Sequence, residues 1–261
     1  MLACTRTTLD AARANLHIML SLVEQGKIKC GAKTLRPSAA TVKLIRASLD
    51  GGDFYSHEDI QSFAWPLILQ AGGLATGPTL KLTAKGKRAQ SRQADQVLIE
   101  LWNDWQLKGP LDEIMRVEAI KGKTGKNVLS ALRPRRIAAA ESIELLPIDS
   151  FMDLDELFGL VYATGDFTCA RYERSVWRFY MEHPEYGSFG YDGRDFAGLV
   201  DKRYLMVLLF EYAATLGLVD VRYIQPENAR DDLESMDLGD VPERVSRYDG
   251  LMQLRLTRIG V

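Results

Sequence analysis

One short phrase occurs twice in this chain, and it constrains the fold more than any other feature of the sequence. Residues 80–86 read Leu-Lys-Leu-Thr-Ala-Lys-Gly, and residues 254–260 read Leu-Arg-Leu-Thr-Arg-Ile-Gly. In each copy the apolar, basic, apolar triplet predicts a short strand with one buried face, and the threonine that follows is a good cap for a helix N-terminus. Each copy also follows an apolar run that ends in Gly-Leu, at residues 73–74 and 217–218, where glycine suits a helix end. The sequence therefore predicts two copies of a helix, a hairpin and a helix start.

This pattern resembles the second half of a winged-helix domain. In that family a three-helix helix-turn-helix core precedes a two-stranded wing, and the Leu-Thr-x-x-Gly phrase closes the wing. The resemblance covers residues 38–92 more fully than residues 150–261, and it implies tandem winged-helix units. Two unrelated β-hairpins are the alternative explanation of the repeat.

The expected fold class is therefore mainly α with short β-hairpins, an α+β arrangement of tandem winged-helix units joined by a helical middle region. We expect an N-terminal winged-helix domain at residues 1–92, a helical basic connector at 93–146, and a second winged-helix-like domain at 147–261. Because few residues follow Thr257, the chain is also expected to be a piece of a longer protein.

Apolar spacing and capping residues place the individual helices. The expected helices cover residues 9–25, 38–49, a short stretch from Ser56, a stretch from Trp65-Pro66, and residues 111–119, 129–145, 151–163, 176–181 and 204–216. A further helix carries a core-facing stripe made of Val97, Leu98, Leu101, Trp102 and Trp105.

Composition excludes several classes of protein. A chain of 261 residues with 46% hydrophobic and 26% charged content can bury an ordinary core. Apolar runs fall short of the roughly 18 residues that span a bilayer, and the N-terminus lacks a secretory apolar region. We therefore expect a cytoplasmic protein that does not bind membranes. Cys4, Cys30 and Cys169 are far apart, so reduced structural thiols are expected.

Charge is distributed unevenly along the chain. Residues 1–136 hold 21 Lys and Arg against 12 Asp and Glu, whereas residues 137–261 hold 12 against 23. This asymmetry predicts a basic face for a polyanion, or an attraction between the halves. Two solvated surfaces of opposite sign are the alternative. The acidic stretch between Gln225 and Arg247 is expected to be a mobile insert in the second wing, with a regulatory role or none.

Residues that could belong to a catalytic or nucleotide-binding motif do not have the spacing that such motifs require. Gly122-Lys123-Thr124 lacks the glycine that a phosphate-binding loop needs five positions earlier, where Val117 stands. The histidines are isolated from one another, and the carboxylates at Asp153, Asp155 and Glu156 are explained by capping of a helix start. We therefore expect a non-enzymatic protein without a metal or cofactor.

Nucleic-acid binding is better supported, but without readout of base sequence. A recognition helix needs polar side chains to reach base edges, and residues 66–71 and 205–210 are almost wholly apolar. Binding would instead use phosphate contacts, with weak sequence selectivity and strong salt dependence. The candidate nucleic-acid-binding residues are Lys81, Lys85, Lys87, Arg88, Lys121, Lys123, Lys126, Arg133, Arg135 and Arg136.

The sequence thus predicts a non-enzymatic winged-helix adaptor that associates with nucleic acid. DNA, bound non-specifically, is one expected partner, and a protein partner or a second copy of the chain is another. Because exposed apolar helices mark partner surfaces, the alternative is a docking or dimerisation scaffold within a larger DNA-processing, SMC-like or defence complex.

Overall fold

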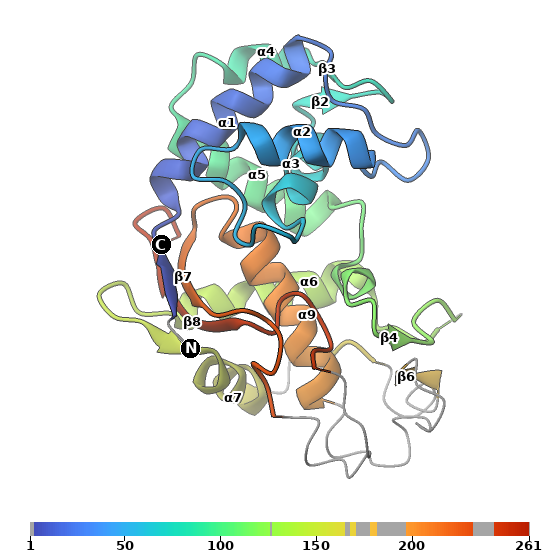
Figure 1. Cartoon of the computed structure of the whole chain (residues 1–261), viewed down its shortest axis with the longest axis vertical. Coiled ribbons are helices and arrows are strands. Elements are labelled where there is room, and N and C mark those ends of the chain that lie inside the picture. The colour runs from blue at the N-terminus through green and yellow to red at the C-terminus, as the bar shows by residue number, and fades with distance from the viewer. Residues whose placement is uncertain are drawn as a thin grey trace. The chain divides into compact units, whose positions relative to one another are not determined.

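The computed structural model describes residues 3–125, 127–164, 168–170, 178–181, 197–231 and 243–260 (Figure 1). This part of the chain is a mixed α+β structure whose sheets are small and antiparallel, which confirms the coarse fold class. Across these residues, none of the helices is long and apolar enough to cross a bilayer.

The chain divides into two compact units that are not consecutive in sequence. Unit A comprises Arg6–Leu111, Phe210–Val221 and Arg255–Val261, and unit B comprises Met1–Thr5, Asp112–Leu209 and Arg222–Leu254. The domain boundaries expected near residues 92 and 146 are not where the units divide. Moreover, Gly217-Leu218 and Thr257 of the second phrase belong to the same unit as the first phrase, not to a separate domain.

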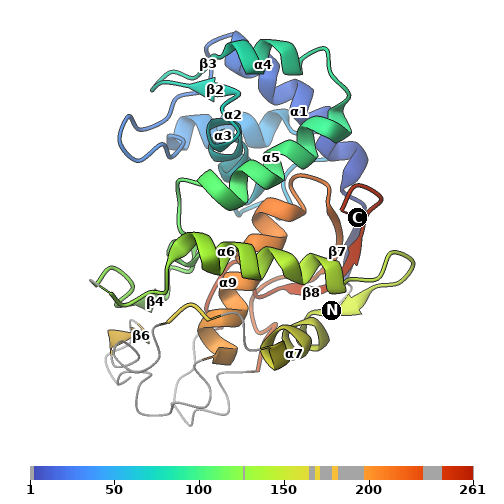
Figure 2. The same ribbon diagram turned by 180° about the vertical axis from the view of Figure 1, so that it is seen from behind.

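Unit A is mainly helical. Its elements, in order, are α1 (Leu9–Glu24), α2 (Ala39–Ser48), α3 (Gln61–Ala71), β2 (Ala75–Thr76), β3 (Lys81–Leu82), α4 (Ala84–Ala89) and α5 (Ala94–Lys108). Helix α5 packs against α1 and α3, and α2 packs on α3, an arrangement seen from behind in Figure 2.

Unit B combines short helices with short strands. Its elements are the 3₁₀ turns η1 (Glu113–Arg116) and η2 (Ser142–Leu145), the helices α6 (Leu132–Glu141), α7 (Leu154–Thr164) and α9 (Lys202–Met206), the π-helical η5 (Ala197–Asp201), and the strands β4 (Ile120–Lys121), β5 (Met152–Asp153) and β6 (Tyr180–Met181).

Four further elements run through the division between the units: β1 (Cys4–Arg6), η6 (Val207–Ala213), β7 (Val219–Tyr223) and β8 (Leu251–Leu256). Strands β1, β7, β8 and β5 form one sheet in that order, and β5 pairs antiparallel with β8, with Met152 opposite Leu254.

Several helices lie where the sequence predicted them. The expected helices at 9–25 and 38–49 are α1 and α2, and the Ser38 hydroxyl caps α2 by accepting from Thr41 N at 3.2 Å. The core stripe on α5 is confirmed, because all five of its apolar residues are buried. The run from Tyr204 to Leu216 is buried throughout and continues from α9 into η6.

The start of α3 differs from the prediction because Asp53 provides its cap. The Asp53 carboxylate accepts hydrogen bonds from Ile60 N, Gln61 N and Ser62 N at 2.9–3.2 Å, and from Ser62 Oγ at 2.6 Å. A carboxylate that satisfies several backbone donors fixes a helix start more strongly than a hydroxyl does. Consequently α3 begins at Gln61 rather than at Trp65-Pro66, and the expected short helix from Ser56 does not form.

The hairpin predicted from the first phrase is present. Strands β2 and β3 pair antiparallel, with Ala75 opposite Leu82 and Thr76 opposite Lys81. The Thr83 side chain then caps α4 by accepting from Gly86 N at 3.0 Å. The expected strand, hairpin and capped helix therefore follow one another at residues 75–89.

Both phrases close in the same way. Thr83 donates its hydroxyl to Gly73 O at 2.7 Å and its N–H to Leu74 O at 3.0 Å, whereas Thr257 donates its hydroxyl to Gly217 O at 2.6 Å and its N–H to Leu218 O at 2.9 Å. Both glycines have positive φ, 65° and 75°, as a helix C-terminus of this type requires. The repeat is thus one backbone arrangement built twice.

The second copy departs from the first after its threonine. Residues 257–260 form a turn, in which Gly260 N donates to Thr257 O at 3.0 Å, rather than the start of a helix. Thr257 therefore closes a turn and does not cap a helix.

Three helix predictions in unit B are corrected. Residues 111–119 contain only the 3₁₀ turn η1, residues 129–145 divide into α6 and η2, and Tyr180–Met181 is a strand that pairs with β4. Residues 171–177, which include the start of the expected helix at 176–181, lie outside the described residues.

Substitution of Gly86 tests the close packing of the first phrase against the end of α3. A Cβ added at Gly86 would lie 2.0 Å from Leu74 O, a backbone atom, whereas a Cβ added at Gly159 in α7 has no neighbour within 4 Å. We expect Gly86→Ala to destabilise the protein by about 1–3 kcal/mol and Gly159→Ala to stabilise it by about 0.5–1 kcal/mol. Urea unfolding monitored by circular dichroism measures both, and equal effects would contradict the close approach.

Candidate nucleic-acid interface

Two segments of unit A are rich in basic residues and contain no acidic residue. Residues 27–49 and 74–92 together carry eleven Lys and Arg and no Asp or Glu. They are separated in sequence by α3 and the four carboxylates at residues 50–59. Whether they form one surface therefore depends on how the chain folds.

Backbone pairing brings the two segments together. Cys30 N donates to Pro78 O at 2.7 Å, and Leu80 N donates to Ile28 O at 2.8 Å. Lys29 lies opposite Thr79 in an antiparallel bridge. Residues 28–30 thus pair with residues 78–80 as a third, strand-like segment beside the β2–β3 hairpin.

The pairing places two lysines on one exposed face. Residues opposite each other in a bridge point to the same side of a sheet, and so do residues two apart on a strand. Lys29 lies opposite Thr79, and Lys81 is two residues beyond Thr79, so both point to the same side. Ile28, Cys30 and Leu80 are buried, whereas Lys29 and Lys81 are exposed. This face of the hairpin is therefore basic.

The loop after residue 30 is held against the rest of unit A. Gly31 N donates to Arg36 O at 2.9 Å, Leu35 N donates to Gly31 O at 2.8 Å, and Gln70 Nε2 on α3 donates to Leu35 O at 2.9 Å. Lys33 and Arg36 are exposed on this loop. Their positive charges are thus presented by a fixed backbone.

Helix α4 adds further charge beside the hairpin. Lys87 and Arg88 are exposed in its last turn, where the helix dipole favours positive charge. Lys85 differs, because its Nζ donates to Gly72 O and to Asp104 Oδ2, both at 2.9 Å. The charge of Lys85 is therefore already neutralised by a carboxylate of its own unit.

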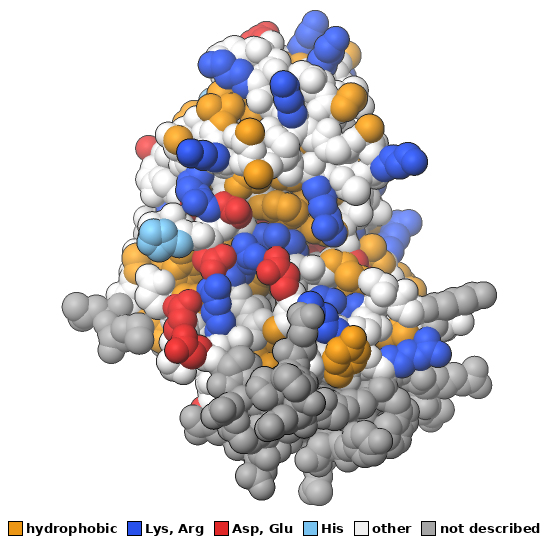
Figure 3. Space-filling view, turned by 45° about the vertical axis from the view of Figure 1, so that its right-hand side comes forward, with side chains coloured by type: hydrophobic (Ala, Val, Ile, Leu, Met, Phe, Trp, Pro, Cys, Tyr) orange, Lys and Arg blue, Asp and Glu red, His pale blue; other side chains and the backbone are white. Residues whose placement is uncertain are grey.

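Ion pairing separates these eleven residues into two groups. Arg46, Lys85 and Arg92 are paired with Asp59, Asp104 and Glu100. The other eight are exposed and, within the described part of the chain, form no ion pair: Lys27, Lys29, Lys33, Arg36, Lys43, Lys81, Lys87 and Arg88. We call these eight residues the basic surface. In the part of Figure 3 drawn uppermost, Lys and Arg side chains stand among neutral atoms with few acidic neighbours.

The helix that would read base edges in a winged-helix protein is not available. All residues of α3 are buried except Phe63 and Gln70, which are half-buried. The Gln70 amide is also bonded to Leu35 O and Pro66 O, both at 2.9 Å. Contacts from the basic surface would therefore be made to phosphates and not to bases.

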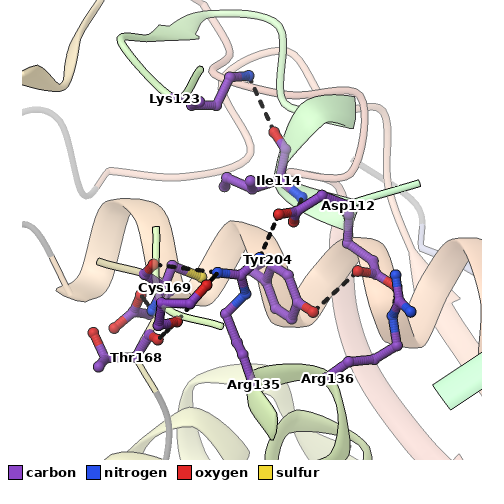
Figure 4. A network of polar contacts seen from close by, with 11 residues as sticks. Asp112, Ile114, Lys123, Arg135, Arg136, Thr168, Cys169 and Tyr204 are labelled. Atoms are coloured by element: carbon purple, nitrogen blue, oxygen red, sulfur yellow. Dashed lines mark hydrogen bonds and ion pairs between the residues drawn. The ribbon is translucent and has the colours of Figure 1, made fainter. Parts of the chain in front are cut away.

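Two arginines predicted to contact nucleic acid are instead part of the core of unit B (Figure 4). The Arg136 side chain is 2% exposed and its Nε lies 2.6 Å from Oε1 of Glu113, which is fully buried. Tyr204 OH donates to the other Glu113 oxygen at 3.0 Å. The prediction for Arg136 is corrected, because a guanidinium buried with its counter-ion cannot reach a phosphate.

Arg135 is buried on the same helix. Its guanidinium pairs with Asp112, donates to Ser130 O at 2.8 Å, and stacks over the Tyr204 ring at 4.9 Å. Although burial opposes its charge, the neighbouring groups raise the pKa of Arg135, so it stays protonated. The prediction for Arg135 is corrected for the same reason as that for Arg136.

Lys123 is also buried rather than presented by a loop. Its ammonium donates to Ile114 O at 3.1 Å and to Val117 O (Figure 4). Burial lowers the pKa of Lys123 to about 8. Lys123 therefore fastens the η1 turn, and its predicted phosphate contact is corrected. Of the remaining candidates, Arg133 is exposed, Lys121 is half-buried, and Lys126 lies outside the described residues.

A buried thiol and a buried carboxyl lie near Arg135. Cys169 is completely buried, and this raises the pKa of its thiol well above the ordinary value. Asp201 accepts from Cys169 N at 2.7 Å, and burial raises the pKa of that carboxyl to about 6. Among the described residues, no group of His, Cys, Asp and Glu could hold a metal ion. The thiol is thus a protonated core residue.

Five members of the basic surface were missed by sequence reasoning: Lys27, Lys29, Lys33, Arg36 and Lys43. The signal that could have found them is the absence of any Asp or Glu between residues 27 and 49. The acidic insert is only partly described, since residues 232–242 lie outside the described residues. Of its described part, Glu227 pairs with Arg244 at 3.2 Å, and the Arg230 side chain is 6% exposed and pairs with Asp155 at 3.0 Å.

Comparison with known proteins identifies no relative. No protein-family model matches the chain, and neither the curated proteins nor the solved structures contain a match.

Two arginines of α6 provide a matched test of the buried pair. Breaking a buried ion pair by removing one partner costs about 3–5 kcal/mol, so Arg136→Met should lower the free energy of unfolding by this amount. Arg133→Met, on the exposed side of the same helix, should change it by less than about 0.5 kcal/mol. Urea unfolding measures both, and similar small effects would show that the pair with Glu113 is not structural.

Proposed function

We propose that unit A is a non-enzymatic, winged-helix-like adaptor module that binds the phosphate backbone of nucleic acid through its basic surface. The observation that carries the proposal is the bridge between Lys29 and Thr79, because it joins two acid-free segments and sets Lys29 and Lys81 on one exposed face.

The order of elements supports the winged-helix part of the proposal. Helix α1, the strand-like residues 28–30, α2, α3 and the β2–β3 hairpin follow one another, as in a helix-turn-helix core with a wing. The matching closures at Thr83 and Thr257 support a repeated unit. In this proposal the hairpin is the wing, and it carries Lys81.

Charge and burial together favour contacts to phosphate over contacts to bases. Lysine and arginine that neutralise phosphates release counter-ions, which gives affinity without sequence preference. Direct readout requires polar side chains in a groove, and α3 is buried. The proposed binding is therefore backbone-driven, weakly selective and weakened by salt.

Removal of three charges from the basic surface tests the proposal. We expect Lys29→Gln, Lys81→Gln and Lys87→Gln, combined in the full chain, to weaken binding of two unrelated DNA duplexes about equally. Because each lost phosphate contact lowers the log–log salt slope by about 0.9, the slope should fall by about 2.7. Fluorescence anisotropy of labelled duplexes at KCl concentrations from about 50 to about 200 mM measures the affinity and the salt slope.

The matched control removes the same charge elsewhere. Arg92, Lys108 and Arg133 lie outside the basic surface, and Arg92 and Lys108 are paired with Glu100 and Asp104. Replacing these three with Gln should leave most of the affinity in place. An equal loss in both triple variants would show that only net charge matters, and a sequence preference that persists at 200 mM KCl would contradict the backbone mechanism.

A second candidate function is protein docking or self-association, favoured by exposed apolar side chains in unit B. Leu145, Ile148, Leu160 and Tyr162 are 41–58% exposed, and they lie on or beside η2 and α7, which pack together. Exposed apolar groups that cluster mark partner surfaces. If the wild-type protein does not bind duplex at 50 mM KCl but sediments as a dimer, and Tyr162→Ser abolishes the dimer, this second function replaces the first.

A further inference from the structure

The basic surface lacks the aromatic side chains on which unpaired bases stack. Residues 27–49 and 74–92, which carry all eight of its charges, contain no Phe, Tyr, Trp or His. Proteins that bind single-stranded nucleic acid without sequence preference combine positive charge with exposed aromatic rings. The basic surface provides only the first of these two features.

The aromatic residues elsewhere in unit A belong to its core. Seven of them are at most 6% exposed, and Phe63 on α3 is half-buried. Several rings pack on one another, since Trp105 stacks on Tyr212 with ring centroids 3.9 Å apart. The seven buried residues are Phe54, Tyr55, Trp65, Trp102, Trp105, Phe210 and Tyr212. The described part of unit A therefore presents no fully exposed ring to a ligand.

Other side chains offer little replacement for aromatic rings. The large hydrophobic side chains that are exposed among the described residues all lie outside residues 27–49 and 74–92. Six of the eight residues of the basic surface are lysines, whose ammonium groups have no flat face. Arg36 and Arg88 are the two that carry a planar guanidinium. An unpaired base would thus find few groups here on which to stack.

A fixed backbone presents the charges of the basic surface. Residues 28–30 pair with residues 78–80, and Gln70 Nε2 holds the loop after residue 30 by donating to Leu35 O at 2.9 Å. A fixed set of charges suits a ligand whose phosphates are also fixed. A duplex carries one negative charge per roughly 1.7 Å of its axis, twice the density of either strand.

We infer that the ligand of the basic surface is a double-stranded nucleic acid, and that single strands bind weakly because the surface offers their bases no stacking partner. The inference rests on the proposed function and names the strandedness of its ligand. A duplex needs no stacking partner from the protein, because its bases are already stacked on one another. DNA and RNA duplexes share this property.

Fluorescence anisotropy of the full chain at about 50 mM KCl tests the inference. The labelled probes are a DNA duplex, an RNA duplex and an oligothymidylate strand, all of equal length. We expect the better duplex to bind about tenfold more tightly than oligothymidylate, or more. Tighter binding of the DNA duplex indicates a B-form ligand, and tighter binding of the RNA duplex indicates an A-form ligand; either result supports the inference.

A tryptophan placed on the hairpin tests the stated cause. Thr76 is exposed and lies opposite Lys81 in the β2–β3 pair, so both side chains point to the same face. Aromatic residues are favoured in strands, so Thr76→Trp should keep the fold and add one stacking position. We expect it to tighten oligothymidylate binding about fivefold or more and to change duplex binding by less than about twofold.

The matched control places the same ring outside the basic surface. Asn103 is exposed on α5, and Asn103→Trp should change neither affinity. Circular dichroism checks that both variants fold. If Thr76→Trp does not fold, the comparison of duplex and single strand in the wild-type protein decides by itself.

Two results would overturn the inference. One is oligothymidylate binding by the wild-type protein that is as tight as duplex binding, and the other is a folded Thr76→Trp protein that binds oligothymidylate no better than the wild type does. Failure of the proposed function gives a different result, because the protein then binds none of the three probes and the inference falls with it. Tight single-strand binding that the combined Lys29, Lys81 and Lys87 variant weakens would keep the proposed function and overturn only the strandedness.

Discussion

Two threonine hydroxyls, those of Thr83 and Thr257, fix how a strand lies against the helix that precedes it. Thr83, directly after β3 of the hairpin, donates to Gly73 O just beyond α3, and Thr257, directly after β8, donates to Gly217 O in the turn beyond η6. Each bond satisfies the carbonyl of the glycine at which the chain leaves the helix. Because the chain reverses at a glycine with positive φ just before, the helix and the strand are held at a fixed distance. In the first copy, this places the hairpin where residues 28–30 can pair with it.

The charges of the two units are neutralised in different ways. In unit B, Arg135, Arg136 and Arg203 are buried with carboxylates, because an isolated charge in an apolar interior is costly. In unit A, the eight residues of the basic surface remain in solvent, where an unpaired charge costs little. Basic residues thus form part of the core in unit B and an exposed surface in unit A.

The sequence predicted correctly those helices and strands whose apolar spacing and capping residue lie within the element itself. The apolar spacing of α1 and α5, the Ser38 cap of α2 and the Leu-x-Leu-Thr hairpin were each sufficient, since period and cap act over a few residues. The short helix expected from Ser56 failed because a more distant group, the Asp53 carboxylate, satisfies the donors at 60–62 and so places the helix start at Gln61. A helix was also expected at residues 111–119, where the carbonyls of Ile114 and Val117 are instead bonded by Lys123.

The sequence by itself determined the repeated phrase, the fold class, the basic first half and the apolar character of α3 that argues against base readout. It did not determine which basic residues are exposed. Lys81, Lys87 and Arg88 remain on the surface, whereas Arg135, Arg136 and Lys123 are buried, although all stand in basic stretches. That choice belongs to the tertiary structure, because a charged side chain is buried only where distant residues supply counter-ions or carbonyls. Glu113, which lies 23 residues from Arg136 in sequence, is such a partner.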